Sequence, residues 1–150
     1  MKPYQKLECY WKEKNANVST IEISESVVKT FEEKNTLIFP NDFREYLLRC
    51  CPKDDFCYDR ETTWWPFGRL KSILEEYKHE VRDPAIMRQN TRYIFFADYS
   101  IWSWAWAIDC GYDENRGRVA VICGYDRLVA DSFSHFVDLY IDNPMRISPT

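Results

Sequence analysis

The sequence predicts an α+β fold: a single domain with about four helices and a mostly antiparallel sheet. Helical spacing dominates the first half of the chain and returns after residue 132, whereas residues 93–130 have the pattern of strands joined by short turns. The chain of 150 residues has the usual length of one domain, and no Gly/Ser- or Pro-rich linker divides it.

Two helices are expected before the middle of the chain. Ser24 is a suitable N-cap for a helix over residues 24–34, in which Val27, Val28 and Phe31 share one face. Asn41 or Asp42 is expected to cap the second helix, because Pro40 keeps the residue before it out of a helix. Four apolar residues of this helix recur at i, i+3, i+4 and i+7, namely Phe43, Tyr46, Leu47 and Cys50.

Two more helices and a short strand are expected further along. The charged residues 53–61 are interpreted as a solvated loop, and residues 62–65 as a short strand. Helical spacing predicts a third helix over residues 70–80. Ser132 caps a final helix, and its apolar face is predicted to be Phe133, Phe136, Val137, Tyr140 and Ile141.

The remaining residues predict an antiparallel meander. Residues 93–97 form a continuous apolar run that is typical of a buried strand, and residues 118–123 and 128–130 follow turn sequences. The strongest alternation of large and small residues lies between them, with Trp102, Trp104, Trp106 and Ile108 separated by Ser103, Ala105 and Ala107.

Residues 1–20 are interpreted as an N-terminal appendage, with the alternative that Leu7, Tyr10 and Trp11 form one turn that docks on the body, and residues 21–150 are interpreted as the folded domain. The N-terminal residues are polar and lack the apolar run of a signal peptide, so a cytoplasmic protein is expected. The longest apolar stretch, around residues 101–108, is too short to cross a membrane, so no membrane partner is expected.

The six cysteines are expected to be reduced thiols that behave as small apolar residues. An even number of cysteines would suggest disulfides in a secreted chain, but no secretion signal is present. No metal site is predicted, because there is no Cys-x-x-Cys or Cys-x-His pair and both His79 and His135 are far from any cysteine in sequence.

The sequence favours a protein that is not an enzyme and needs no cofactor. The four glycines do not form a phosphate-binding loop. A Cys123–His135 nucleophile pair lacks a third, orienting group, and the many acidic residues are more typical of loops and caps than of acid/base catalysis. The net charge of −4 argues against direct nucleic-acid binding and is compatible with a basic protein partner.

The tryptophans allow two interpretations. Alternating large aromatic residues usually form the covered face of a sheet, and this is the interpretation that we weigh more heavily. If the small residues face the helices instead, the rings form an exposed stripe with an acidic rim, since residues 98–114 contain no Lys or Arg. The candidate partner-binding residues are Trp102, Trp104, Trp106, Asp98, Asp109, Asp113 and Glu114.

Three stretches in a fixed order resemble the SUKH superfamily, which contains bacterial immunity proteins and a fungal regulator of cell-wall glucan synthesis. They are FEEKNTLIFPNDFREYLL at residues 31–48, PFGRLKSI at residues 66–73 and VADSFSHF at residues 129–136. The resemblance covers about residues 21–142.

The SUKH resemblance implies a non-catalytic protein-binding domain with an α+β fold, in which helices flank a curved, mostly antiparallel sheet. By analogy with the bacterial relatives, we expect an immunity protein that binds a cognate toxin domain, such as a nuclease or deaminase, and neutralises it by stoichiometric inhibition. The alternative is a regulatory or scaffold protein that binds an endogenous partner, as in the regulation of cell-wall synthesis. The family has no universal catalytic residues, so the resemblance assigns none here.

Overall fold

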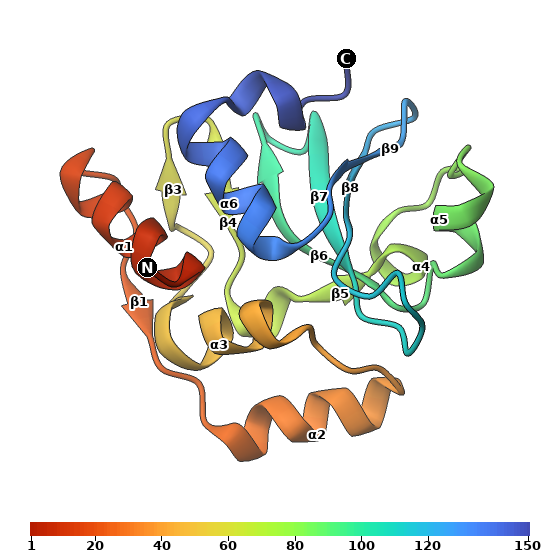
Figure 1. Ribbon diagram of the computed structural model, residues 1–150, viewed down its shortest axis with the longest axis horizontal. Helices are drawn as coiled ribbons and strands as arrows, with labels where there is room; N and C mark the ends of the chain where they lie inside the picture. Colours follow the sequence, from red (N-terminus) through yellow and green to blue (C-terminus); the bar gives the residue numbers. More distant parts are fainter.

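The computed structural model describes residues 1–150 as a sheet of seven antiparallel strands with helices packed around it (Figure 1). The strands lie in the order β3-β4-β6-β7-β8-β9, and β5 pairs with β6 further along the same edge as β4.

The helices are α1 (Pro3–Glu13), α2 (Glu25–Asn35), α3 (Asn41–Cys50), α4 (Ile73–Glu76), α5 (Pro84–Arg88) and α6 (Phe133–Asp142). The strands of the sheet are β3 (Tyr58–Asp59), β4 (Thr62–Trp64), β5 (Lys71–Ser72), β6 (Tyr93–Tyr99), β7 (Trp104–Asp109), β8 (Val119–Ile122) and β9 (Arg127–Ala130). A separate two-stranded sheet pairs β1 (Thr20–Ile21) with β2 (Cys51–Pro52). The predicted α+β class is therefore confirmed.

Strands β6 to β9 form the predicted meander, and β6 lies at the centre of the core. Consecutive side chains of a strand point to opposite faces of the sheet. Phe96 packs on one face against Phe133 and Phe136 of α6, while Phe95 packs on the other against Trp65. Both faces of β6 are therefore covered, which explains why residues 93–98 are buried without alternation.

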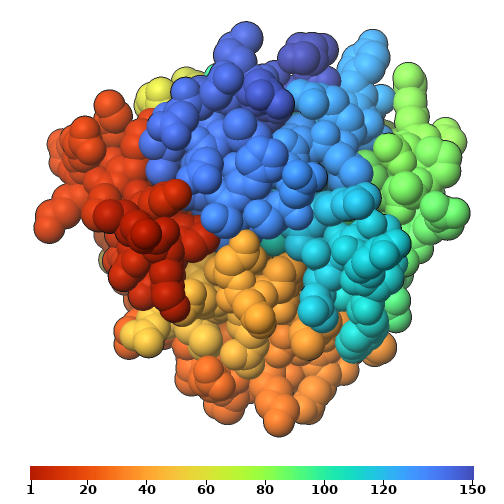
Figure 2. Space-filling model, viewed as in Figure 1, coloured from red at the N-terminus to blue at the C-terminus, as the bar shows by residue number.

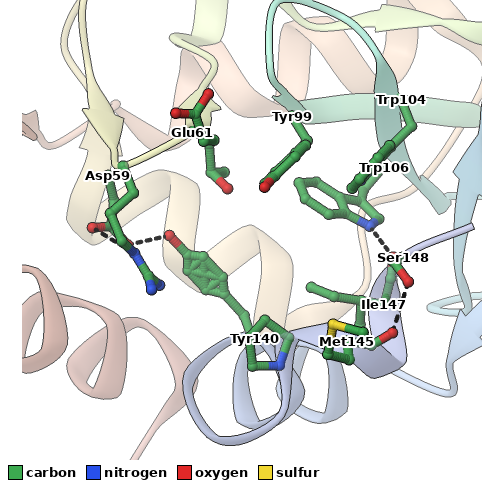
Figure 3. Close-up of a pocket in the computed structure, with 12 residues that line it drawn as sticks. Asp59, Glu61, Tyr99, Trp104, Trp106, Tyr140, Met145, Ile147 and Ser148 are labelled. Carbon is green, nitrogen blue, oxygen red and sulfur yellow. Dashed lines mark hydrogen bonds and ion pairs between the residues drawn. The ribbon is translucent and has the colours of Figure 1, made fainter.

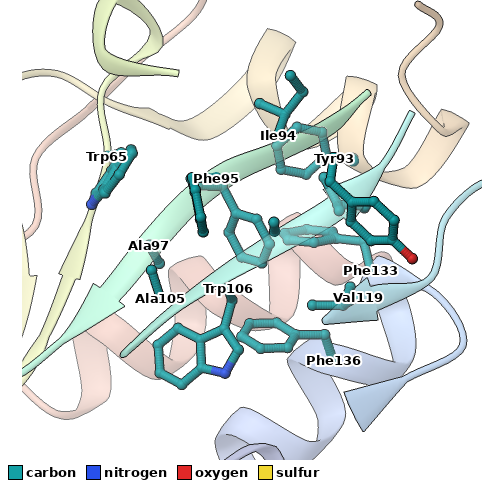
Figure 4. Packing of buried hydrophobic residues seen from close by; sticks show 14 of the residues in the cluster. Trp65, Tyr93, Ile94, Phe95, Ala97, Ala105, Trp106, Val119, Phe133 and Phe136 are labelled. Carbon is teal, nitrogen blue, oxygen red and sulfur yellow. The ribbon is translucent and has the colours of Figure 1, made fainter. Parts of the chain in front are cut away.

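Helix α6 covers one face of the sheet, as the spacing of its apolar residues predicts. Ser132 is its N-cap and accepts a hydrogen bond from the backbone N–H of His135 at 3.0 Å. Phe133 and Phe136 are fully buried, and Figure 4 shows Phe136 beside Trp106 of β7, with ring centroids 5.4 Å apart. Ile141, expected on the same face, is only partly buried.

Asp42 serves two helices, because its Oδ1 atom accepts a hydrogen bond from the backbone N–H of Phe43 in the first turn of its own helix at 2.8 Å. Pro40 occupies the N-cap position of α3 and provides no side-chain hydrogen bond. The Oδ2 atom of Asp42 accepts a hydrogen bond from the backbone N–H of Ser134 at 2.9 Å, in the first turn of α6. The carboxylate therefore satisfies a helix N-terminus that lies 92 residues away in the sequence.

The N-terminal residues are part of the core, which corrects their interpretation as an appendage. Helix α1 packs against α3 and α6, and Figure 2 shows the N-terminal residues in red against α6 in blue. Leu7 is fully buried, and the ring of Trp11 meets Trp64 edge to face at 5.2 Å. These two residues are four positions apart and so lie on one face of a helix, a pattern that is short and surrounded by polar residues.

The helix expected over residues 70–80 is replaced by β5 and the single turn of α4. Lys71 and Ser72 pair with Phe95 and Ile94 of β6, so this segment completes the edge of the sheet. Ser72 then caps α4, which ends before Tyr77. A short helix that was not predicted, α5, follows Asp83, whose side chain accepts hydrogen bonds from the first turn.

Residues 53–61 are not the solvated loop that their charge suggests. They include β3, which pairs with β4, and both Cys57 and Asp59 are buried. Asp59 is only 3% exposed, so a carboxylate from this segment reaches the interior. Its surroundings form part of the candidate site.

Candidate functional site

The predicted tryptophan stripe is interrupted, because β7 begins at Trp104. Ser100, Ile101 and Trp102 have left-handed backbones with φ of 48°, 53° and 62°, and they form the turn between β6 and β7. We call these three residues the β6–β7 turn. The alternation of residue sizes therefore continues past the end of the strand and does not indicate one face.

The three tryptophans have different surroundings. Trp102 stacks on Tyr77 at 5.7 Å and meets Phe95, so it lies on the face of β6 away from Phe96. Trp104 stacks on Tyr99, with centroids 4.3 Å apart and planes 6° from parallel. Trp106 is only 2% exposed, which confirms the core interpretation for this residue and rules out an exposed three-tryptophan stripe.

The four acidic candidates do not form a rim around these rings. Asp98 is buried and accepts hydrogen bonds from Trp65 Nε1 at 2.7 Å and from the backbone N–H of Trp102 at 2.8 Å. Its role is to hold the β6–β7 turn. Asp109 is also buried, and its Oδ1 accepts a hydrogen bond from the backbone N–H of Gly111 at 2.8 Å.

Asp113 and Glu114 are exposed, but they lie at the other end of the sheet. In the β6–β7 register, Tyr99 faces Trp104 at one end and Tyr93 faces Asp109 at the other. Asp113 and Glu114 follow Asp109 in the β7–β8 connection, a strand length away from Trp104. The seven predicted residues therefore do not make a single contact surface.

We expect Asp109→Asn to unfold at the same or a slightly higher urea concentration than the native chain at pH 7. Burial raises the pKa of Asp109, so its ionised form is less favourable in the folded state than in the unfolded state. The stabilisation that comes from the neutral carboxyl is present at low pH and is lost as the pH rises through the folded pKa. Asparagine stays neutral and keeps an oxygen acceptor for Gly111, so any difference between the two proteins should shrink as the pH is lowered to 4.

The contrasting variant is Asp98→Asn. Both oxygens of Asp98 accept hydrogen bonds, and an amide can replace only one of them, so we expect a loss of about 1–3 kcal/mol. A loss of more than about 1 kcal/mol for Asp109→Asn at pH 7 would contradict the direction of its pKa shift.

Cys123 and His135 have separate surroundings. His135 Nδ1 accepts a hydrogen bond from the backbone N–H of Asp131 at 3.1 Å, which ties the ring to the start of α6. Cys123 lines a shallow hollow with Glu76 and His79 instead. All six cysteines have free thiols, and no three His, Cys, Asp or Glu residues are grouped so that they could hold a metal ion.

A partly enclosed cavity lies at the end of the sheet that carries the β6–β7 turn (Figure 3). It has a volume of about 270 Å³, and we call it the aromatic pocket. Four rings line it, Tyr99, Trp104, Trp106 and Tyr140. Residues 59–62 of the β3–β4 hairpin and the 3₁₀ turn η2 (Pro144–Ile147) complete the wall, and the Nε1–H of Trp106 donates to the carbonyl oxygen of Ile147 at 2.8 Å.

One buried carboxylate lies in this wall. Tyr140 donates its hydroxyl hydrogen to Asp59 Oδ2 at 2.5 Å and accepts a hydrogen bond from Trp64 Nε1 at 3.4 Å. The pKa of Tyr140 is raised, chiefly by burial and then by its hydrogen bond to Asp59, so the phenol keeps its proton. Asp59 thus lies in the wall as a carboxylate acceptor, with the Tyr140 hydroxyl as its hydrogen-bond donor.

Sequence reasoning did not find Asp59, Tyr99 or Tyr140 as site residues. Asp59 lies among other charged residues in a segment with the composition of a loop. Tyr140 was expected on the buried face of the last helix, where its hydroxyl gives no separate signal. The pairing of β3 with β4 and of β4 with β6, together with the hydrogen bond from Tyr140 of α6, brings these residues together.

Comparisons with protein-family models, with curated proteins and with solved structures found no match to this chain. None of the helices has the length and apolar character needed to cross a bilayer.

Proposed function

We propose that this chain is a non-catalytic binding domain that acts in the cytoplasm and neutralises a cognate bacterial toxin domain by forming a stoichiometric complex. That the partner is a toxin domain is inferred from the resemblance to SUKH immunity proteins. The observation that carries the binding role is Ile101, an apolar side chain that is 98% exposed at the β6–β7 turn.

The backbone at this position is unfavourable for isoleucine. A left-handed conformation costs of the order of 1–3 kcal/mol for a residue other than glycine, and a β-branched side chain is especially disfavoured there. No burial of Ile101 within the chain offsets this cost. Strained backbone that its surroundings hold in place clusters at functional sites, which supports a contact with another molecule at this turn.

The turn is held in place, so it presents Ile101 with little remaining freedom. Asp98 accepts the backbone N–H of Trp102, and the Ser103 hydroxyl donates to the carbonyl oxygen of Ser100 at 2.8 Å. The backbone N–H of Ser100 donates to the carbonyl oxygen of Glu61, also at 2.8 Å, which joins the turn to the β3–β4 hairpin. Such preorganisation lowers the entropy cost of binding.

Aromatic residues flank the turn on both sides. Tyr99 and Trp104 border the aromatic pocket, while Trp102 borders the hollow that contains His79. Tyr and Trp are enriched at the residues that dominate binding energy in protein interfaces. This end of the sheet therefore supports a protein contact better than the strand faces, which are buried.

The test is co-expression with toxin domains encoded beside its gene, read by cell survival and by isolation of the complex. We expect the native chain to protect and to form a one-to-one complex. Ile101→Asn should weaken binding at least about tenfold, as loss of a central interface residue does. Asparagine tolerates the left-handed backbone, so the variant should be no less stable than the native chain.

The matched control is Val27→Asn, which removes an exposed β-branched side chain from α2. It should leave protection and binding unchanged. Equal binding by native protein and Ile101→Asn would contradict the contact at the turn. A complex with a cell-wall synthesis protein, together with no protection against any toxin, would favour the regulatory alternative.

A further inference from the structure

We infer that the aromatic pocket receives a lysine or arginine side chain of the protein partner. This inference rests on the proposed function, because the cation is supplied by the bound protein. It goes further by assigning a chemical class of ligand to one cavity.

Aromatic ring faces attract a cation, and the faces available to one exclude those that Tyr99 and Trp104 cover by stacking on each other. Figure 3 shows Asp59 and Trp106 on opposite sides of the pocket, with Tyr99 and Tyr140 between them. A cation within about 6 Å of such ring faces gains roughly 0.5–2 kcal/mol, and the gain is larger where water is excluded. Within the chain, the Lys and Arg residues that lie over rings are paired with other aromatic residues, Tyr10, Trp65, Tyr112 and Tyr125. The four rings of the pocket thus have no cation of their own.

The charge of the wall favours a cation as well. Asp59 is 97% buried by its side-chain surface, and only its Oδ2 accepts a hydrogen bond, from Tyr140. The nearest positive group to Oδ1 is Arg60 Nε at 3.8 Å, too far for a hydrogen bond. A buried carboxylate is stabilised when a charged donor pairs with it. Exposed Glu61, on the same hairpin, adds a second negative charge at the rim.

Arg60 lines the same pocket and lies 3.8 Å from Asp59, but this distance is too long for a hydrogen bond to the carboxylate. Its guanidinium donates to the hydroxyl of Tyr10 on α1 at 2.8 Å, and the side chain is mostly exposed. It therefore lies at the rim as a positive charge that competes with an incoming cation. We therefore expect opposite effects from two substitutions. Removing the charge of Arg60 should strengthen cation binding, whereas removing the charge of Asp59 should weaken it.

The size of the pocket suits a single side chain. Cavities for drug-sized ligands usually span about 300–1,000 Å³, and this one is smaller, at about 270 Å³. It also adjoins the β6–β7 turn through Tyr99 and Trp104, so a partner that contacts Ile101 can place one residue in the pocket.

The experiment follows the indole N–H resonances of Trp104 and Trp106 by NMR while a small probe is added to the isolated chain. The probes are the N-acetyl methylamides of lysine, of arginine and of norleucine, which is apolar and close to lysine in size. We expect the two cationic probes to shift both resonances and to bind about tenfold more tightly than norleucine. Added salt should weaken the cationic probes selectively.

Charge variants then test the two sides of the wall. Asp59→Asn should weaken the lysine probe about tenfold, since the amide keeps an acceptor for Tyr140 but removes the charge. Should Asp59→Asn fail to fold, Glu61→Gln serves as the second variant and should weaken the same probe by a smaller factor. Arg60→Gln should strengthen binding, and Asp113→Asn, at the far end of β7, is the control that should change nothing.

Equal binding of norleucine and lysine probes would overturn the inference, and so would an absence of shifts with all three. Either result would leave the proposed function untouched, because that function is tested by protection and by Ile101→Asn. Conversely, the chain could bind the cationic probes selectively and still protect against no toxin. That result would support cation binding by the aromatic pocket and would contradict the proposal that the chain neutralises a toxin.

Discussion

Phe136→Ala is expected to lower the free energy of unfolding by about 3–5 kcal/mol, a large share of the stability of a domain of this size. Phe136 is fully buried in α6, where it joins the helix to the sheet. The centroid of its ring lies within 6.5 Å of the ring centroids of five other aromatic residues, Trp64, Phe96, Trp106, Phe133 and Tyr140. Alanine would leave a cavity among rigid aromatic rings that have little freedom to collapse into it. Urea denaturation of the two proteins measures the difference.

The matched control for Phe136→Ala is Leu139→Ala on the same helix. Both substitutions introduce the same residue, so differences in helix propensity are small. Leu139 is only partly buried at the edge of the core, and we therefore expect a clearly smaller loss. Native-like urea midpoints for Phe136→Ala would contradict the packing of α6 against β6 and β7.

The starts of α2 and α6 were predictable from local sequence. The helices that begin after Ser24 and Ser132 form where a capping residue precedes apolar residues at helical spacing. In each case the serine oxygen accepts a backbone N–H of the first turn, at 3.3 Å from Val27 and 3.0 Å from His135. Local chemistry alone determines these starts, so one sequence is enough to find them.

Helical spacing failed at residues 70–80 because tertiary pairing decided that segment. Lys71 and Ser72 complete the hydrogen bonding of β6, a central strand that would otherwise have a free edge at Phe95. The amphipathic pattern there is real, since Leu70 and Ile73 are buried, but it also suits a strand followed by one helical turn. The spacing of residues 70–80 alone does not show that β6 lies beside this segment and pairs with it.

The tryptophan stripe was wrong for a related reason. Residues 102–108 alternate in size, but alternation marks one sheet face only while the chain stays extended. Three left-handed residues end β6 and send Trp102 to the opposite face. None of the three is glycine, so composition gave no sign of a turn at this point.

The candidate site could be predicted only in part. Trp104 was included in the predicted contact surface and does border the aromatic pocket, but for a different reason from the one that suggested it. Asp59 was missed because charged residues in a connecting segment are usually solvated, and the burial of one of them depends on the pairing of β3 with β4. Asp98 and Asp109 were predicted to bind a partner, but both are buried and accept hydrogen bonds from backbone N–H groups of their own chain.

Alkaline pH is expected to unfold this protein in a pH range that many domains tolerate, because three of its buried thiols have raised pKa values in the folded state. Burial is the chief cause that raises the pKa of each, to about 12 for Cys51 and well above the ordinary value for Cys50 and Cys110. In the unfolded chain these thiols ionise near pH 8.5–9, so the unfolded state loses protons first. The stability that they contribute is therefore complete below about pH 8 and falls as the pH rises.

Three thiols that stay protonated in the folded state give a slope of roughly 4 kcal/mol per pH unit once the unfolded thiols have ionised. The free energy of unfolding should then be about 5 kcal/mol lower at pH 10 than at pH 7, and the raised pKa values of buried Tyr46, Tyr93 and Tyr140 extend the decline beyond pH 10. Urea midpoints between pH 7 and 10, measured with a phosphine reductant, test this expectation. Cys51→Ala should remove about one third of the slope, because one of the three thiols is gone, whereas a midpoint independent of pH over that range would show that the thiols are not shielded from water.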